Sequence, residues 1–303
     1  MYFKNAIDAI GHTPLVEMAH LTPNKKVRIL AKLEGQNLGG SASIKDRVAK
    51  YMLQKAEQTG ELTKDKIIIE ATSGNTGIAL ALLGHKLGYK VTIVMPDNMS
   101  LERRQLLRIF GAELILTKGA YGMSAAIDTA RELAAQDKKY FMPDQFSNPA
   151  NPQAHYETTA AEIIKDFPYD KIDVLVAGIG TGGSIVGISR RLKEKYPNIR
   201  VIGVEPPPDD FIQGLKCIEG LKEIPPFLDL SLITERVFVT SQQAAIATKQ
   251  LLDKEGIFVG LSSGAVVHQA IKVANEMDEG NIVVVLADGG WKYLSLDFWT
   301  KAK

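Results

Sequence analysis

The chain has 303 residues, of which 45% are hydrophobic and 23% are charged. Its 36 lysines and arginines nearly balance its 35 aspartates and glutamates, which argues against nucleic acid or an anionic membrane as its partner. The single cysteine, Cys217, cannot form an internal disulfide or a thiolate zinc cage. Neither a secretory signal nor an apolar run of about 20 residues is visible. We therefore expect a soluble cytoplasmic protein.

Short β-branched runs alternate with amphipathic stretches along the chain. The runs are typical of strands covered on both faces, and we expect strands at residues 29–33, 67–71, 91–95, 114–117, 174–177, 201–204, 237–240 and 282–286. We expect helices at residues 46–59, 76–87, 101–110, 123–136, 183–195, 242–255 and 265–276. This alternation predicts an α/β fold with two open, mostly parallel, doubly wound sheets.

Two stretches rich in proline interrupt the pattern. Residues 147–153 contain two Asn-Pro pairs, and we expect a linker there that continues neither helix nor strand. This linker predicts an N-terminal α/β domain of residues 1–149 and a C-terminal α/β domain of residues 150–303, with the first 35 or so residues packed on the C-terminal domain. Residues 205–226 form a long irregular insertion, and such loops are often functional.

Gly178, Gly180 and Gly183 match the pattern G-x-G-x-x-G between a predicted strand and a predicted helix. With Glu205 at the end of the next strand, they support an NAD-dependent dehydrogenase as one hypothesis. The alternative is a shorter phosphate-binding cup, because backbone N–H groups at a helix start bind any phosphate.

Residues 260–264, Gly-Leu-Ser-Ser-Gly, match the nucleophile elbow of serine hydrolases. That chemistry requires an acid and then a histidine later in the chain. The only later histidine, His268, precedes Asp288 and lies too close to Ser262 in sequence, so we reject a hydrolase. The five histidines show no metal-ligand spacing, and we expect no metal site.

Two further features point to one kind of chemistry. Lys45 follows a Gly/Ser loop and begins a helix near Arg47, and this positive potential disfavours a protonated amine, as a nucleophilic lysine requires. Residues 72–77, Thr-Ser-Gly-Asn-Thr-Gly, offer hydroxyl and N–H groups to a carboxylate. Together with the phosphate cup and Ser262, these features indicate a pyridoxal phosphate site.

The order of these motifs resembles fold-type II pyridoxal phosphate enzymes, specifically the cysteine synthase (O-acetylserine sulfhydrylase) and cystathionine β-synthase group. The resemblance runs from Ile10 to Ser295, and residues 95–104 and 144–149 look most like B-type cysteine synthases. It implies a tryptophan synthase β-like fold with the active site in the cleft between the domains. It also implies a pyridoxal 5'-phosphate cofactor, a homodimer, and an amino acid and a sulfur nucleophile as small-molecule partners. A serine acetyltransferase partner stays open.

The resemblance also implies roles for individual residues. Lys45 would form the Schiff base, Asn75 would bind the cofactor's ring hydroxyl and Ser262 would meet its pyridine nitrogen. The phosphate loop would comprise Gly180, Thr181, Gly182, Gly183 and Ser184. The substrate-binding residues would be Thr72, Ser73, Gly74, Thr76 and Gln145. The implied reaction is β-replacement, in which O-acetyl-L-serine and sulfide give L-cysteine and acetate through an aminoacrylate. A neutral serine at the ring nitrogen favours loss of the β-substituent.

The chain departs from the family pattern beside the lysine. Leu38 replaces a proline and two extra residues precede Lys45, which leaves the substrate open. Lys216 is a candidate to bind the phosphate of an O-phosphoserine substrate. An acidic residue nearby would instead activate water in a cysteine lyase that releases hydrogen sulfide. The acidic candidates are Asp209, Asp210 and Asp229. Solvated loop charges are the alternative for all four. A cystathionine β-synthase-like enzyme and a catalytically silent relative also stay open, although intact Lys45, Asn75 and Ser262 argue against the latter.

Overall fold

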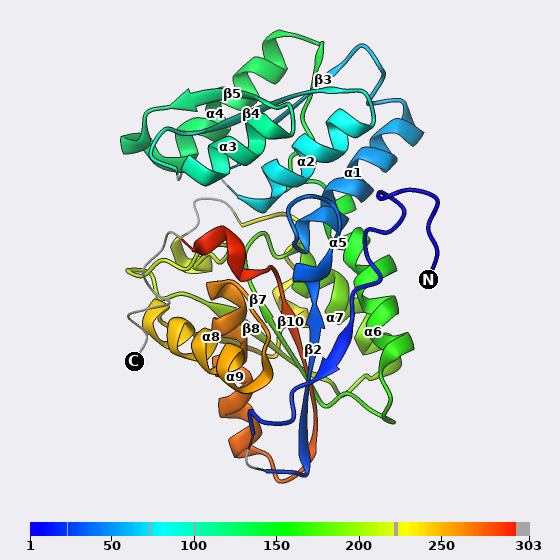
Figure 1. Ribbon diagram of the computed structural model, residues 1–303, viewed down its shortest axis with the longest axis vertical. Coiled ribbons are helices and arrows are strands. Elements are labelled where there is room, and N and C mark those ends of the chain that lie inside the picture. The colour runs from blue at the N-terminus through cyan, green and yellow to red at the C-terminus, as the bar shows by residue number, and fades with distance from the viewer. Residues whose placement is uncertain (23, 73, 100, 221–223, 295–303) are drawn as a thin grey trace. The chain divides into compact units, whose positions relative to one another are not determined.

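The computed structural model describes residues 1–22, 24–72, 74–99, 101–220 and 224–294 (Figure 1). The chain divides into two compact units, each assembled from two segments. Unit 1 comprises Met1–Gly11 and Asn37–Ala150, and unit 2 comprises His12–Gln36 and Asn151–Lys303.

Unit 1 contains a parallel four-stranded sheet with the strand order β5-β4-β3-β6. Its strands are β3 (Ile67–Ala71), β4 (Lys90–Pro96), β5 (Glu113–Thr117) and β6 (Tyr140–Phe141). Its helices are α1 (Lys45–Thr59), α2 (Asn75–Lys86), α3 (Leu101–Ile109) and α4 (Gly122–Gln136). Successive side chains of a strand point to opposite faces, so Ile68 packs in the core with α1, α2 and α3 whereas Ile69 packs with α4.

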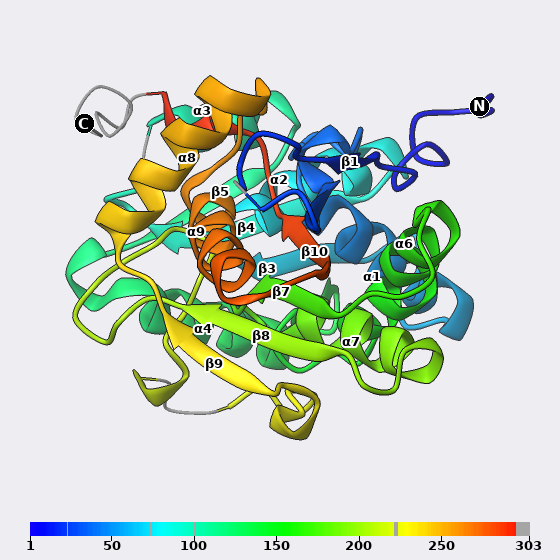
Figure 2. The same cartoon turned by 90° about the horizontal axis from the view of Figure 1, so that it is seen from below.

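Unit 2 contains a six-stranded sheet with the order β1-β2-β10-β7-β8-β9, in which only β1 runs antiparallel to its neighbour. Its strands are β1 (Leu15–Glu17), β2 (Val27–Leu33), β7 (Val174–Gly178), β8 (Arg200–Glu205), β9 (Glu235–Phe238) and β10 (Gly280–Leu286). Helices α6 (Ala160–Asp166) and α7 (Gly183–Lys195) cover one face, and α8 (Ser241–Glu255) and α9 (Leu261–Glu276) cover the other (Figures 1 and 2).

These two sheets confirm the predicted α/β class and its mostly parallel strands. The expected linker at residues 147–153 is wrong from Ala150 onward, where α5 (Ala150–Ala154) begins and leads through a π-helical segment (His155–Thr159) into α6. Pro152 lies in the first turn of α5, where its missing N–H requires no partner. The Asn148 side chain accepts a hydrogen bond from the Ala150 N–H at 2.9 Å, which helps the helix to begin.

The described residues of the insertion after β8, 206–220 and 224–226, are irregular, as expected, apart from a short 3-10 turn at Ile218–Gly220. Two of its side chains, Ile212 and Leu215, are buried in the core formed with α8 and α9. The Lys216 N–H also donates to the Ile179 carbonyl oxygen at 2.8 Å. The insertion is thereby anchored beside the carboxyl end of β7.

Candidate active site

Lys45 is the first residue of α1 and is half-buried. Its backbone N–H donates to Ser43 Oγ at 3.1 Å. The predicted nucleophilic lysine therefore lies at the positive end of a 15-residue helix, where the helix dipole disfavours a further positive charge.

The loop that precedes Lys45 is ordered around Asp46. This carboxylate is fully buried and accepts hydrogen bonds from Ser41 N (3.1 Å), Ser41 Oγ (2.7 Å) and Ser43 N (3.1 Å). Ala42, between the two serines, has a φ of 44°, which is uncommon for a residue with a side chain. The additional loop residues thus take one defined conformation, held by the neighbour of Lys45 in the chain.

The predicted substrate loop joins β3 to α2. Thr72 is buried, and its Oγ1 accepts a hydrogen bond from the Gly74 N–H at 3.3 Å. Asn75 is the first residue of α2, and Ser73 lies outside the described residues. A Cβ atom built on Gly74 would meet no heavy atom of the described chain within 4 Å. The start of α2 therefore borders open space, as a ligand site requires.

Gln145 joins this loop from a distant part of the sequence. The Thr76 hydroxyl donates to Gln145 Oε1 at 2.7 Å, and both side chains are buried. The structure thus brings together two of the residues predicted to bind a substrate carboxylate. A hydroxyl, a side-chain amide and the N-terminal end of α2 are suitable donors for such an anion.

The predicted phosphate loop joins β7 to α7 in unit 2. Gly182 has a φ of 87°, which favours glycine. A Cβ atom on Gly180 would lie 2.4 Å from the Gly214 carbonyl oxygen, and one on Gly183 would lie 2.0 Å from Asn151 Oδ1. The glycines are therefore required by close packing as well as by backbone conformation.

Thr181 is held within this loop by two hydrogen bonds. Its Oγ1 accepts from Asn151 Nδ2 at 3.1 Å and from the Gly183 N–H at 3.3 Å. Ser184, half-buried, follows as the second residue of α7. Asn151 thus fixes the loop from outside. The loop leads directly into the 13-residue helix α7, whose N-terminal end is a favourable place for a phosphate.

Ser262 is buried in the first turn of α9. The Gly260 N–H donates to the Asp288 carbonyl oxygen at 3.2 Å, which places this turn at the carboxyl end of β10. A Cβ atom on Gly214 would lie 3.6 Å from Ser262 Oγ, and Gly214 also contacts Gly180. The predicted phosphate loop and the predicted pyridine-nitrogen partner therefore lie on either side of one glycine, and a glycine cradle beside a buried hydroxyl fits a phosphorylated heteroaromatic cofactor.

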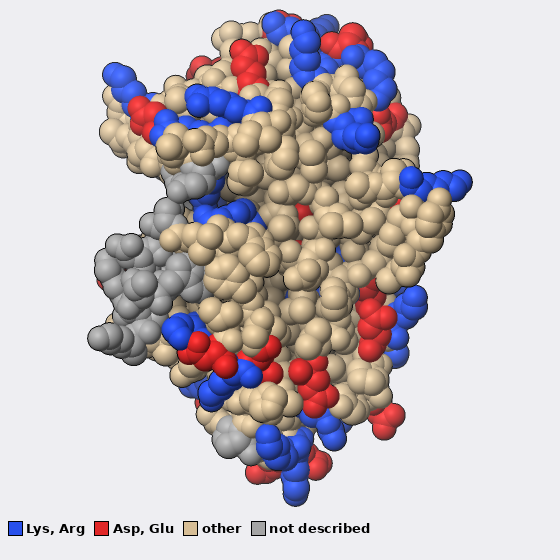
Figure 3. Space-filling model, in the orientation of Figure 1, with Lys and Arg blue, Asp and Glu red and all other residues tan. Residues whose placement is uncertain are grey.

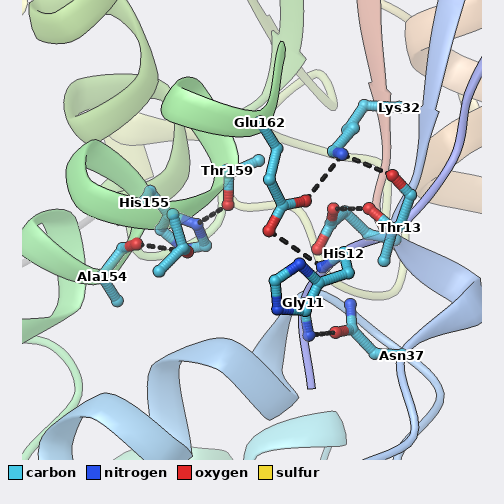
Figure 4. Close-up of polar contacts among 11 residues, drawn as sticks. Gly11, His12, Thr13, Lys32, Asn37, Ala154, His155, Thr159 and Glu162 are labelled. Carbon is cyan, nitrogen blue, oxygen red and sulfur yellow. Dashed lines mark hydrogen bonds and ion pairs between the residues drawn. The ribbon is translucent and has the colours of Figure 1, made fainter. Parts of the chain in front are cut away.

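Unit 2 holds a fully buried lysine, Lys32, near the carboxyl end of β2. Figure 4 shows its Nζ between Glu162 Oε2 at 2.7 Å and the Thr13 carbonyl oxygen at 2.5 Å. Glu162 also accepts the His12 N–H at 2.9 Å. A carboxylate and a carbonyl oxygen both engage the Lys32 amine, so Lys32 is suited to a structural role and not to nucleophilic chemistry.

The charged residues of the insertion have different surroundings. Lys216 is half-buried, and burial lowers the pKa of its amine. Asp229 is exposed and accepts from Ser231 N (3.0 Å) and Ser231 Oγ (2.6 Å), which lowers the pKa of its carboxyl. Asp210 accepts from the Ser241 N–H at 2.6 Å. Asp229 is therefore engaged in a local turn and Asp210 contacts the first residue of α8, whereas Lys216 is desolvated.

Three residues that support the predicted site carried no motif of their own. Asn151 fixes the phosphate loop, Asp46 orders the lysine loop and Gly214 separates Gly180 from Ser262. Asp46 stands next to a predicted nucleophile in the sequence, and this position was a usable signal. Asn151 and Gly214 act through contacts between distant segments, which local sequence does not reveal.

Lysines and arginines are nearly balanced by aspartates and glutamates in this chain. On the face seen in Figure 3, basic and acidic side chains are interspersed, in keeping with the formal net charge of +1. Across the described parts of the chain, no cluster of three or more His, Cys, Asp or Glu residues could hold a metal ion. No helix in those parts is long and apolar enough to cross a membrane.

Comparison with known proteins gives concordant matches. A family model described as "Pyridoxal-phosphate dependent enzyme" matches residues 6–288. A cysteine synthase of Buchnera aphidicola is 43% identical over 97% of this chain and 94% of its own length.

Two solved structures are also similar to this chain. A hydrogen sulfide-producing enzyme from Fusobacterium nucleatum has a TM-score of 0.89 and 44% identity over 97% of this chain and all of its own. A cysteine synthase from Entamoeba histolytica has a TM-score of 0.92 and 37% identity over 99% of this chain and 91% of its own. These matches extend across both units.

Proposed function

The chain belongs to the family of pyridoxal-phosphate dependent enzymes, and from this membership we propose that it makes L-cysteine by β-replacement on O-acetyl-L-serine, with sulfide as nucleophile and acetate as leaving group. The observation that carries the choice of an amino-acid substrate is the contact between Thr76 and Gln145 at the start of α2. Cysteine synthases at 40–43% identity over nearly the whole chain support the choice of reaction.

In this proposal the cofactor is held by residues of the predicted site. Lys45 would bind it covalently and Asn75 would donate to its ring hydroxyl. The loop from Gly180 to Ser184 would hold its phosphate, and Ser262 would face its ring nitrogen. Bound pyridoxal phosphate supplies an electron sink for negative charge at the substrate Cα. The neutral Ser262 hydroxyl does not keep the ring nitrogen protonated as a carboxylate would, which favours loss of a β-substituent over transamination.

The substrate is oriented and the proton is moved by residues of unit 1. Thr72, Ser73, Gly74, Thr76 and Gln145 bind the carboxylate, so that the Cα–H bond is presented in a fixed direction. Lys45 Nζ takes the Cα proton as a general base and returns it to Cα after sulfide has added at Cβ. Exclusion of water at the occupied site protects the reacting substrate from hydrolysis.

Two alternative substrates are each favoured by one observation. Similarity to the hydrogen sulfide-producing enzyme of Fusobacterium nucleatum favours a lyase that releases hydrogen sulfide from cysteine. The desolvated Lys216 favours an O-phosphoserine donor, because a buried amine gains most from pairing with a phosphate.

The cellular setting is also part of the proposal. We propose that the protein is cytoplasmic, since the lone Cys217 fits a reducing compartment. We also propose a homodimer, as the family resemblance implies. Light scattering on the purified holoenzyme measures the dimer directly, and a monomeric mass would contradict it.

The substrate is decided by three parallel assays on the purified holoenzyme. O-acetylserine with sulfide, O-phosphoserine with sulfide, and cysteine alone are supplied separately, and cysteine or sulfide is quantified. The proposal expects the first to have the highest kcat/KM and Lys45→Ala to abolish it. Faster turnover of O-phosphoserine, lost in Lys216→Met, or faster sulfide release from cysteine would replace the proposed reaction with the corresponding alternative.

A further inference from the structure

Unit 1 contains a buried acid to which the proposed function gives no role. Glu70 lies in β3, is 1% exposed and precedes the substrate loop by one residue, Ala71. Strand β6 pairs only with Ile67 and Ile68. Beyond Ile68 the neighbour of β3 is the segment that leads to Gln145, and the Glu70 side chain faces this segment.

The segment beside Glu70 is a tight turn. Asp144 has a φ of 48°, and its carbonyl oxygen accepts hydrogen bonds from the Ser147 N–H (3.0 Å) and the Asn148 N–H (2.9 Å). Gln145 follows directly and accepts the Thr76 hydroxyl. Because a non-glycine residue with positive φ persists only where its surroundings hold it, the position of Gln145 depends on what stabilises Asp144.

The electrostatic environment of Glu70 favours its neutral form. Burial, followed by the nearby Asp144 carboxylate, raises the pKa of Glu70 to about 8, while the backbone N–H groups of Gln145, Ala71 and Asp144 oppose this rise. Glu70 Oε2 has no hydrogen-bond partner among the described residues. The other charged group close to this turn is Arg131, 4.0 Å from the Asp144 carboxylate. An ionised Glu70 would therefore add a second negative charge to the turn that carries Gln145.

We propose that Glu70 is a positioning residue for the pocket that binds the amino-acid carboxylate. Its neutral carboxyl group supports the turn at Asp144, and this turn holds Gln145 opposite Thr76. Ionised, it would repel Asp144 and also place negative charge behind the site of an anionic substrate group. The proposal rests on the proposed function, which assigns Thr76 and Gln145 to carboxylate binding.

Glu70→Gln is the decisive variant, because glutamine keeps the shape and cannot ionise. The probe is L-methionine, which has the amino-acid carboxylate but no leaving group at Cβ. Its dissociation constant for the holoenzyme is measured from pH 6.5 to pH 9.5, by the cofactor's absorbance and by calorimetry. Glu57→Gln is the matched control in the same unit, since hydrogen bonding to Tyr89 already lowers the pKa of Glu57.

We expect the wild-type dissociation constant for L-methionine to rise about tenfold between pH 7 and pH 9. The reason is that Glu70 ionises in this range and only protein with neutral Glu70 binds well. Wild type and Glu70→Gln should therefore bind equally at pH 7 and differ about tenfold at pH 9, while Glu57→Gln follows wild type. Glu70→Ala should weaken binding several-fold at every pH by removing the support of the turn.

Parallel pH profiles for wild type and Glu70→Gln would overturn the positioning role, and so would unchanged binding by a folded Glu70→Ala. Should Glu70→Ala fail to fold, the glutamine variant still decides the question. A wild-type protein that binds no cofactor would instead refute the proposed function itself, and the two failures are thereby distinguished.

Discussion

Glu70→Gln is expected to stabilise the protein at alkaline pH. In the folded protein, burial and then Asp144 raise the pKa of Glu70 from 4.5 to about 8. Since each pKa unit corresponds to about 1.4 kcal/mol, ionising this carboxyl in the native state costs up to about 5 kcal/mol. Glutamine of the same shape avoids this cost, because it carries no charge at any pH.

The direction of the pH dependence follows from proton binding. Between pH 4.5 and about 8, native Glu70 keeps a proton that the unfolded chain releases. The free energy of unfolding of the wild type therefore falls as pH rises through this window and levels off above it. The difference between Glu70→Gln and wild type should be near zero at pH 4.5 and reach its maximum by pH 9.

The assay is urea unfolding of both proteins at pH 5, 7 and 9 with saturating cofactor, since a ligand of the native state alone shifts the midpoint. Glu57→Gln is the control of opposite sign: hydrogen bonding to Tyr89 lowers the pKa of Glu57, so its removal should destabilise the protein at neutral and alkaline pH. An advantage of Glu70→Gln that is the same at pH 5 and pH 9 would refute the reasoning.

Three further predictions concern the framework of the site. Lys32→Met should lower the free energy of unfolding by about 3–5 kcal/mol, because it removes the ammonium partner of the half-buried Glu162 carboxylate. Loss of the exposed pair in Lys249→Met should cost only about 0.3–0.5 kcal/mol, and equal effects in urea unfolding would contradict the distinction. Thr240→Ala removes the capping box of α8 and should cost about 0.5–2 kcal/mol, measured as a lower urea midpoint; an unchanged midpoint would exclude this cap as a stabilising contact. Gly183→Ala places a Cβ atom 2.0 Å from Asn151 Oδ1 and should lower the free energy of unfolding by about 1–3 kcal/mol. It should also weaken cofactor retention in equilibrium dialysis, and full retention would show that the loop can move aside.

The strands and helices with a clear hydrophobic pattern could be predicted from the sequence. The expected strand at residues 67–71 matches β3, and the expected helix at residues 183–195 matches α7. β1 and β6 were missed, because three and two residues show no periodicity. The edge strand β9 was placed two residues late, since Thr240, assigned to the strand, is the N-cap of α8.

The start of α9 shows why local composition misleads. The amphipathic pattern predicted this helix at residues 265–276, yet α9 begins at Leu261. Gly264 lies inside the helix, and glycine is required there because a Cβ atom would be only 1.9 Å from Thr248 Oγ1 of α8. Glycine there allows two helices to approach closely, and this requirement appears only in the tertiary structure.

The candidate site divides in the same way. Its motifs are local, so Lys45, the loop from Thr72 to Thr76 and the glycines of the phosphate loop could be recognised in the sequence. The turn at Asp144 and the buried carboxyl of Glu70 could not, because they depend on where β6 ends and on a positive φ. Electrostatics of this kind arises only when distant segments exclude water together.

The most direct test of the account is to identify the lysine that carries the cofactor. The holoenzyme is reduced with borohydride, which fixes pyridoxal phosphate to its lysine, and the digested protein is mapped by mass spectrometry. The added mass is expected on the peptide that contains Lys45, and no added mass is expected in Lys45→Ala. Labelling of Lys32 or Lys216 in its place, or an unlabelled protein, would contradict the assignment of Lys45 as the residue that binds the cofactor and moves the substrate proton.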